Sequence, residues 1–403
     1  MGSLYFPPKP NSFVIGVTHL LGAPLAKLFY NLTLQVSVED VRRLQGLREQ
    51  RVIYLVNHPS FNDPIPVMLL SARVKKGFFY MASIEQFGGF LGRYLQRIGS
   101  YSVRRGQSDR PSMKETLALI NQPKTHLVIF AEGGCSFQND TVMPFRPGAI
   151  QLAFQSMKRM LKDGQAIPDV YVVPLALKYE FRGNVIAYID DLLHRLEVRL
   201  QLSVKAELSR YQRLRAIAVR VIERIEQDYG FDSINKEGDL SQKVEALKIQ
   251  LLEHCEKTVG IAANPKFSFR ERIYQVEAVA TESPETIVGM TLKKFKQSIF
   301  RLFNFSAISD GYVAQNPTPE RFLDVLVRLE REIFEIDRPK YQGKRWVHAQ
   351  LGESFNLKDY WSDYERDRHI TVDRLIQKAH DEVQRKLDEF PQTPINSSLG
   401  LGK

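Results

Sequence analysis

Cysteine is scarce in this sequence, since only Cys135 and Cys255 occur among 403 residues. No metal-ligand spacing joins them to one another or to the eight scattered histidines. We therefore expect neither a disulfide framework nor a structural metal site, and a reducing compartment is the natural setting.

Processing signals are also lacking. Residues 1–12 have neither the charged start nor the cleavage site of a signal peptide, and Phe6 stands where a myristoylation motif requires Ser or Thr. The longest apolar stretch, residues 13–36, is interrupted near its centre by Pro24 and Lys27, which argues against a clean membrane-spanning helix. We predict two short helices lying in a membrane interface, with a hairpin packed into the core as the alternative.

Acidic residues are under-represented in one half of the chain. The net charge of +10 arises within residues 1–189, which hold 22 Lys and Arg against 12 Asp and Glu, whereas residues 190–403 hold 34 of each. Such a basic surface suits anionic lipid headgroups or phosphorylated substrates. No helix-turn-helix, zinc-finger or aromatic RNA-binding motif accompanies the charge, so we expect no nucleic-acid partner.

The stretch that organises the chain is residues 51–64. Residues 52–56 form a continuous apolar run rich in β-branched side chains, typical of a strand buried on both faces in a largely parallel sheet. Asn57 and His58 follow at its carboxyl end. Because a proline comes next, His58 is predicted to lie in a turn and not on a helix.

Asp63 precedes a second proline and is predicted to be the N-cap of a helix over residues 64–73. Across a strand-turn-helix junction, His58 and Asp63 can converge as a base and its orienting carboxylate. The alternative is a turn histidine and a helix cap without catalytic roles.

Further predicted strands end in residues suited to anions. Residues 78–82 form one strand, and residues 99–106 another that ends in Arg104 and Arg105, which are either solvated surface or phosphate ligands. The strand over 125–130 is followed by Glu132, Gly133 and Gly134, where glycines allow positive φ and the approach of an anion to backbone amides.

The following segment adds a helix and two more strands. Arg146 precedes a predicted helix over residues 148–161, giving a further cation near a helix start. The predicted strand over 170–179 contains Pro174, which favours an edge position or a bulge. Residues 185–189 are predicted to be the last strand.

The composition changes after residue 190, where strand-like runs give way to charged helices. The helices expected from capping residues and stop signals span residues 205–229, 239–259, 319–336 and 371–390. We predict a helical domain of unknown role over residues 191–390 and a disordered tail over 391–403.

Four blocks of this sequence, taken in order, resemble those of the glycerolipid acyltransferase family, which includes the 1-acylglycerol-3-phosphate acyltransferases. Residues 57–63, NHPSFND, resemble the His-x4-Asp block, and residues 99–105 resemble the second block, which ends in arginine. Residues 130–136, FAEGGCS, resemble the Phe-Pro-Glu-Gly-Thr-Arg-Ser block, and residues 173–176 the Val-Pro-containing block.

The resemblance implies a mixed, largely parallel α/β sheet flanked by helices over residues 37–190, which follows the interfacial helix pair predicted from the apolar stretch within residues 1–36. It implies acyl transfer from acyl-CoA or acyl-carrier protein to a lysophospholipid or glycerol phosphate, most concretely 1-acylglycerol-3-phosphate, on the cytoplasmic face of a membrane, peripheral or monotopic. No cofactor is implied beyond the acyl thioester donor. The implied site comprises His58 and Asp63 in catalysis, Arg104, Arg105, Glu132, Gly133, Gly134 and Arg146 in substrate binding, and Asn57, Ser136 and Pro174 in support of the motifs.

The third block departs from the family pattern, with Ala131, Gly134 and Cys135 in place of Pro, Thr and Arg. The family arginine is associated with the acceptor phosphate. Either another arginine supplies that charge, or the acceptor is not a simple glycerol phosphate. Two further alternatives are a Cys135-dependent thioesterase or ping-pong enzyme and a non-catalytic lipid-binding protein.

Overall fold

A computed structural model describes residues 5–105, 109–203, 207–231, 240–265, 267–306, 311–339 and 343–390. The chain divides into two compact units. Among the described residues, the α/β unit comprises those up to Arg182 together with those from Lys344 to Phe390, and the helical unit comprises those between Gly183 and Gly343. Each unit is described by itself.

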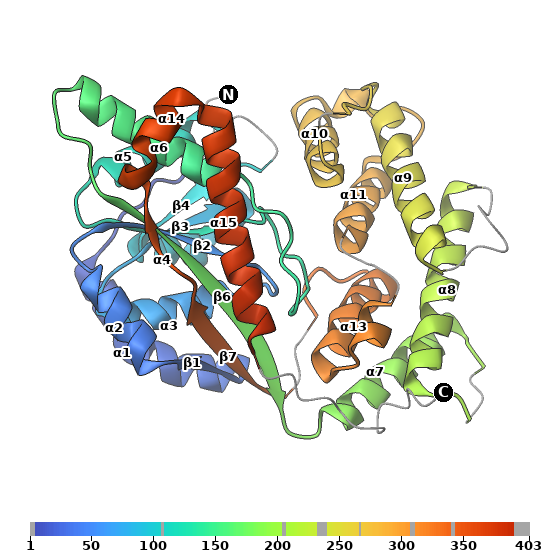
Figure 1. Cartoon of the computed structure of the whole chain (residues 1–403). Helices are drawn as coiled ribbons and strands as arrows, with labels where there is room; N and C mark the ends of the chain where they lie inside the picture. Colours follow the sequence, from blue (N-terminus) through green and yellow to red (C-terminus); the bar gives the residue numbers. More distant parts are fainter. Residues whose placement is uncertain are drawn as a thin grey trace. The chain divides into compact units, whose positions relative to one another are not determined.

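The α/β unit is built on one sheet, to which the described residues contribute eight strands (Figure 1). The main path runs in the order β1 (Leu32–Val36), β7 (Lys344–Leu351), β6 (Val170–Arg182), β2 (Arg51–Val56), β5 (His126–Phe130), β3 (Phe79–Ser83) and β4 (Ser100–Val103), and the short β8 (Phe355–Asn356) also pairs with β6. Strands β6, β2, β5, β3 and β4 are mutually parallel, while β7 is antiparallel to β6 and parallel to β1. The predicted mixed, largely parallel sheet is confirmed.

Successive residues of β2 enter two different cores, as the pleat of a strand requires. Ile53 and Leu55 belong to a core with helices α5 (Arg110–Asn121), α6 (Gly148–Lys162) and α15 (Arg368–Asp388). Val52, Tyr54 and Val56 belong to a core with helices α1 (Ser12–Tyr30), α2 (Val38–Gly46) and α3 (Pro64–Val74). Both faces are thus covered, which explains why residues 52–56 of this strand form a continuous apolar run.

The N-terminal segment is one helix and not the predicted pair. Helix α1 begins after Asn11, whose side chain accepts a hydrogen bond from the backbone of Val14, and ends at Asn31 with φ +50°. Pro24 lies inside it. The helix packs against α3 so closely that a Cβ at Gly22 would lie 3.1 Å from the Met68 side chain. We attribute the continuity across the proline to this packing, since tertiary contacts override local propensity.

Residues 32–36, predicted to continue the apolar helical segment, form β1 at an edge of the sheet. Pro174, in contrast, is not on an edge strand, because β6 lies between β2 and β7. On the β7 side, pairing with β7 begins at Leu175 and pairing with β8 ends at Val172. Pro174 has no backbone N–H to donate, and it lies in the gap between the β8 pairing and the β7 pairing, where no strand hydrogen bond is lost.

The helical unit contains α7 (Val185–Leu200), α8 (Arg210–Tyr229), α9 (Leu240–Thr258), α10 (Phe269–Glu282), α11 (Leu292–Phe305), α12 (Tyr312–Gln315) and α13 (Pro319–Phe334). The predicted strand over 185–189 is wrong, because these residues begin α7. Asn184 caps this helix by accepting a hydrogen bond from Ala187, and its buried residues Ile189, Leu192, Leu193 and Leu196 have helical spacing.

The helical domain was predicted over residues 191–390, but the helical unit ends at Gly343. β6 and β7 form an antiparallel pair in which Arg182 lies opposite Lys344, so the helical unit is inserted between two paired strands. After the insertion the chain adds β7, β8, α14 (Trp361–Arg366) and α15 to the α/β unit. The sequence pattern did not reveal β7, because a buried Arg345 and an outward Trp346 break the alternation of apolar and polar side chains that marks a strand. The predicted tail, 391–403, lies outside the described residues.

Candidate active site

His58 and Asp63 converge in the turn between β2 and α3, as the sequence predicts. The Nδ1 atom of His58 lies 2.7 Å from Oδ2 of Asp63. The Asp63 side chain is fully buried, and that of His58 is 17% exposed. The turn that the prolines impose brings together two side chains that would diverge on a continuous helix.

Asp63 is not the helix cap that the sequence predicts. Its own backbone is helical, and its side chain makes no capping hydrogen bond to α3. Both carboxylate oxygens instead accept hydrogen bonds from other groups of the site. Oδ2 also accepts the backbone N–H of Ser60 at 2.9 Å, and Oδ1 accepts the hydroxyl of Tyr179 at 2.6 Å.

The ring of His58 stacks on Phe130 at the end of β5, with ring centroids 4.5 Å apart. A carboxylate accepts hydrogen bonds, so the contact with Asp63 places the neutral ring's proton on Nδ1. Nε2 then presents its lone pair, and no side chain in the described part of the chain forms a hydrogen bond with it. This arrangement provides a histidine base with a fixed tautomer.

The third block packs directly on the His58 turn. Oε1 of the buried Glu132 accepts the backbone N–H of His58 at 2.6 Å, and the backbone N–H of Ser136 donates to the His58 carbonyl at 2.8 Å. The amide of Ala131 donates to the carbonyl of Val56. The third block, more than 70 residues away in sequence, therefore holds the backbone of His58 at both its N–H and its carbonyl.

Arg146 belongs to the same cluster. Its backbone N–H donates to the carbonyl of Ala131, and its side chain lies over Gly133. Gly133 has φ +74°, as the predicted turn requires, but its amide donates to the carbonyl of Phe130. This amide is therefore already engaged and cannot serve an oxyanion without rearrangement. Gly134 lies in the same turn.

The second block lies further away. Arg104 and Arg105 follow β4, three strands from β2, and at the usual strand spacing this corresponds to roughly 14 Å. Arg105 is exposed, and the backbone of Arg104 donates to Asp109. The strand ends share one edge of the sheet, but no described contact joins these arginines to His58.

Asn57 is a structural residue of this site. Its buried side chain forms two hydrogen bonds with the backbone of Leu177 on β6, one as donor and one as acceptor. Pro174 lies in the same strand opposite Leu55. The residue that the sequence did not reveal is Tyr179, because nothing in its local pattern indicates a contact with Asp63, 116 positions away.

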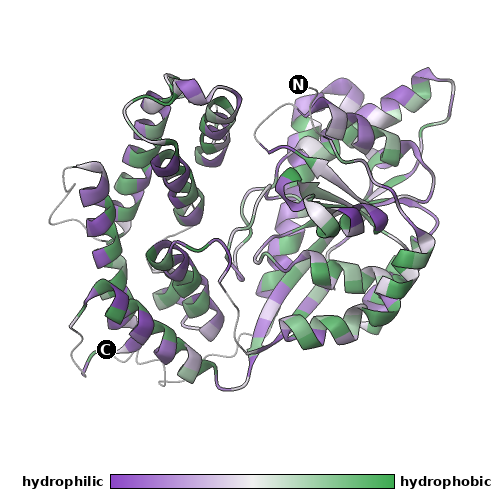
Figure 2. Cartoon of the chain, turned by 180° about the vertical axis from the view of Figure 1, so that it is seen from behind, coloured by the Kyte–Doolittle hydropathy of each residue, from purple (hydrophilic) through white to green (hydrophobic). Residues whose placement is uncertain are grey.

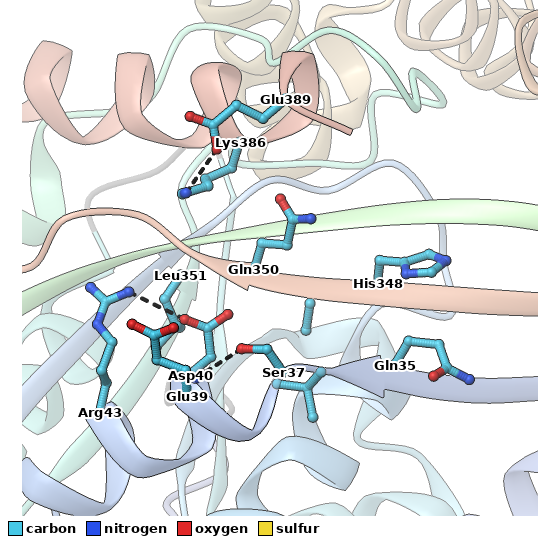
Figure 3. A pocket seen from close by; sticks show the side chains of 12 residues that line it. Gln35, Ser37, Glu39, Asp40, Arg43, His348, Gln350, Leu351, Lys386 and Glu389 are labelled. Carbon is cyan, nitrogen blue, oxygen red and sulfur yellow. Dashed lines mark hydrogen bonds and ion pairs between the residues drawn. The ribbon is translucent and has the colours of Figure 1, made fainter. Parts of the chain in front are cut away.

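A cavity of about 540 Å³ lies elsewhere in the α/β unit, where β1 and β7 meet α2 and α15 (Figure 3). Among its lining side chains, Arg43 pairs with Asp40 at 3.2 Å and Lys386 with Glu389 at 2.8 Å. None of the predicted site residues lines it. No group of three His, Cys, Asp or Glu side chains in the described ranges is placed to hold a metal ion.

Helix α1 exposes an unusually apolar surface. It is the one described helix long and apolar enough to cross a membrane, with a mean hydropathy of 1.5 and little burial. Phe13, Leu20 and Leu28 are 80%, 76% and 71% exposed. Figure 2 shows hydrophobic residues on the helices that cover this face of the sheet. Such a surface is consistent with membrane association, as predicted.

Comparison with protein families found a match for the segment that carries this site. A model of the family described as Acyltransferase matches residues 35–178, which include His58, Asp63, Glu132 and Arg146. A search of curated proteins found no match. The chain therefore carries, at residues 35–178, an acyltransferase domain of the glycerolipid type, with lipid acyl transfer as its general activity.

Proposed function

We propose that this protein transfers a fatty acyl group from acyl-CoA or acyl-carrier protein to the free hydroxyl of 1-acylglycerol-3-phosphate, producing phosphatidic acid. The observation that carries the proposal is the 2.7 Å contact between His58 Nδ1 and the fully buried Asp63. A thioester is already activated toward attack, so the reaction chiefly needs a base for the alcohol. A neutral histidine suits that task.

In this mechanism Nε2 of His58 takes the proton of the acceptor hydroxyl as its oxygen attacks the thioester carbonyl carbon. Asp63 holds the ring and stabilises the imidazolium that forms. The tetrahedral intermediate collapses with cleavage of the carbon–sulfur bond. The departing sulfur receives the proton from His58, which regenerates the neutral base, and no covalent enzyme intermediate is required.

The acceptor phosphate needs a cation to replace the arginine that is Cys135 here. Arg146 is well placed for that role, because its side chain is half-buried and lies against Gly133, which is in the same turn as Cys135. A guanidinium can bind a phosphate through two parallel hydrogen bonds. Glu132 acts in the same site by holding the backbone of His58. Arg104 and Arg105 add positive charge at the shared edge of the sheet.

The membrane assignment rests on how α1 is attached. At its start, the amide of Asn11 donates to the carbonyl of Arg97. At its end, the carbonyl of Asn31 accepts the amide of Arg345, and the chain enters β1 directly. Both ends are thus tied to the α/β unit, and we propose that α1 lies in the plane of the interface on the cytoplasmic side. Lys27 provides an exposed cation for anionic lipid.

The test incubates the purified protein with labelled acyl-CoA or acyl-carrier protein and four acceptors: 1-acylglycerol-3-phosphate, lysophosphatidylcholine, glycerol 3-phosphate and monoacylglycerol. We expect phosphatidic acid from the first, and a loss of at least a thousandfold in His58→Ala, on the order of a missing general base. A folded His58→Ala protein with normal turnover would overturn the mechanism. A preference for monoacylglycerol would overturn the proposal that 1-acylglycerol-3-phosphate is the acceptor.

Two variants refine the result. Arg146→Gln should raise the KM for 1-acylglycerol-3-phosphate about tenfold or more while leaving monoacylglycerol unaffected, because a charge-assisted phosphate contact contributes about 1.5–3 kcal/mol. Cys135→Ser should retain activity without a trapped acyl-enzyme. Loss of activity together with an acyl adduct on the wild-type thiol would favour the ping-pong route instead.

A further inference from the structure

We propose that Tyr179 is a positioning residue of this acyltransferase site, holding Asp63 in the orientation and charge state that His58 requires. The inference rests on the proposed function, because it assigns a partner to the proposed base. Tyr179 lies on β6, one residue beyond the region matched by the family model.

The contact is short and enclosed. The hydroxyl of Tyr179 donates to Oδ1 of Asp63 at 2.6 Å, within a site where the tyrosine is 5% exposed and the aspartate is fully buried. Oδ2 is occupied by His58 and by the Ser60 amide. Within the described ranges, Tyr179 is the hydrogen-bond donor that serves the other oxygen.

The backbone of Tyr179 is held as firmly as its hydroxyl. The side chain of Asn139 donates to the Tyr179 carbonyl and accepts its amide, both at 2.7 Å. Asn57 makes the same pair of bonds with Leu177 two residues earlier. Two asparagine side chains thus continue the hydrogen bonding of the sheet past the end of β2. The phenol is delivered to Asp63 from a rigid strand, as a positioning role requires.

A buried carboxylate stays ionised only when donors replace water. Charged groups around this pair include Glu132, at the backbone of His58, and Arg146, over Gly133. Another is Arg345 of β7, whose guanidinium lies 5.6 Å from the Tyr179 ring centre. Removing the Tyr179 hydroxyl leaves Oδ1 without that donor, which disfavours the Asp63 anion and favours protonation of the His58–Asp63 pair.

The test compares Tyr179→Phe with Tyr54→Phe in the full chain. Tyr54 is a matched control, because it is also buried and its hydroxyl bonds the side chain of His126, away from the His58 turn. In Tyr179→Phe we expect kcat to fall about tenfold, with acceptor KM within about twofold. The acid limb of the kcat/KM profile should move to higher pH. In Tyr54→Phe, kcat and the profile should stay unchanged.

A double-mutant cycle separates positioning from general structural damage. If the hydroxyl acts through the Asp63 anion, Tyr179→Phe should change kcat less than about twofold in an Asp63→Asn background. Equal effects in both backgrounds, or an unshifted acid limb, would overturn the inference. If Tyr179→Phe does not fold, site-specific 3-fluorotyrosine at 179 replaces it, and its more acidic hydroxyl should move the limb to lower pH.

Failure of the underlying function looks different from failure of this inference. If His58→Ala retains turnover, the histidine mechanism is wrong and the cycle has no meaning for catalysis. If His58→Ala is inactive while Tyr179→Phe matches the wild type in kcat and pH profile, only the role of Tyr179 is lost.

Discussion

Arg146 lies directly over Gly133: a Cβ built on this glycine would be 2.5 Å from Nε and 2.8 Å from Cδ of the arginine. Gly133 also has φ +74°, a conformation that side chains strain. The third block therefore requires glycine at position 133 for two reasons. The turn needs a positive φ, and the Arg146 side chain occupies the space that a Cβ would take. The same contact locates the cation that we propose for the acceptor phosphate.

Gly133→Ala should displace the arginine and strain the turn. We expect a loss of roughly 1–3 kcal/mol in unfolding free energy and a fall in acyl transfer of at least tenfold. Gly164→Ala is the matched control, because Gly164 has φ +76° and no atom lies within 4 Å of the place its new methyl group would occupy. Gly164→Ala should lose stability through the same backbone strain but keep full acyltransferase activity. Equal loss of activity in both variants would refute a specific role for the Gly133–Arg146 contact.

Replacing Phe13 and Leu20 by serine should weaken membrane attachment. Burial of each such side chain is worth about 1.5–3 kcal/mol, so the double variant should bind anionic liposomes at least a hundredfold more weakly in flotation assays. Ile370→Ser on α15 is the control, because Ile370 is a comparably exposed apolar residue outside α1. Unchanged flotation of the double variant would show that α1 is not the contact and leave the basic surface as the attachment.

His126 should make the α/β unit sensitive to acid. Burial lowers the pKa of its imidazole from 6.5 to about 4. His126 therefore binds a proton below about pH 6.5 in the unfolded chain, but only below about pH 4 in the folded protein. Stability from this group is present at pH 7 and falls with pH, by about 2 kcal/mol at pH 5.

The two tryptophans of the chain, Trp346 and Trp361, both lie in the α/β unit, so their fluorescence reports the unfolding of that unit alone. Urea titrations at pH 7 and pH 5 should show a smaller loss of stability in His126→Asn than in the wild type. An identical loss in the two proteins would mean that other groups account for the acid sensitivity.

Removing the helical unit should leave the α/β unit able to fold. Arg182 and Lys344 are opposite one another in the β6–β7 pair, so a short Asn-Gly turn can replace residues 183–343. We expect a single cooperative tryptophan transition in the shortened chain. A chain without such a transition would show that the inserted helices are required for the fold. If it folds, its activity measures what the helices contribute to substrate use.

Local patterns in the sequence were sufficient to predict the core of the site. An apolar run of β-branched residues specifies a buried strand, and the proline after His58 ends it in a turn, because proline restricts the backbone of the preceding residue. These constraints act over a few residues, so they survive in any tertiary setting. The Glu132–Gly133 turn was predictable for the same reason.

Patterns failed where distant segments decide the structure. Two helices were predicted in place of α1, because the sequence does not show that Gly22 packs on α3. Strand β7 was not predicted, because its partners, β1 and β6, lie far away in sequence. Asp63 was predicted to be a helix cap, since only the fold places the Tyr179 hydroxyl beside it.

The sequence by itself thus determined the largely parallel sheet and the placing of His58 at a strand end, because short-range periodicity and turn chemistry carry that information. Its four blocks carry the resemblance to the acyltransferase family, whose model matches residues 35–178. Tertiary structure alone decided that the helices are inserted between β6 and β7, that Arg146 covers Gly133 and that Tyr179 donates to Asp63. These are contacts between residues far apart in the chain, which are specified by packing of the whole unit and not by any local pattern.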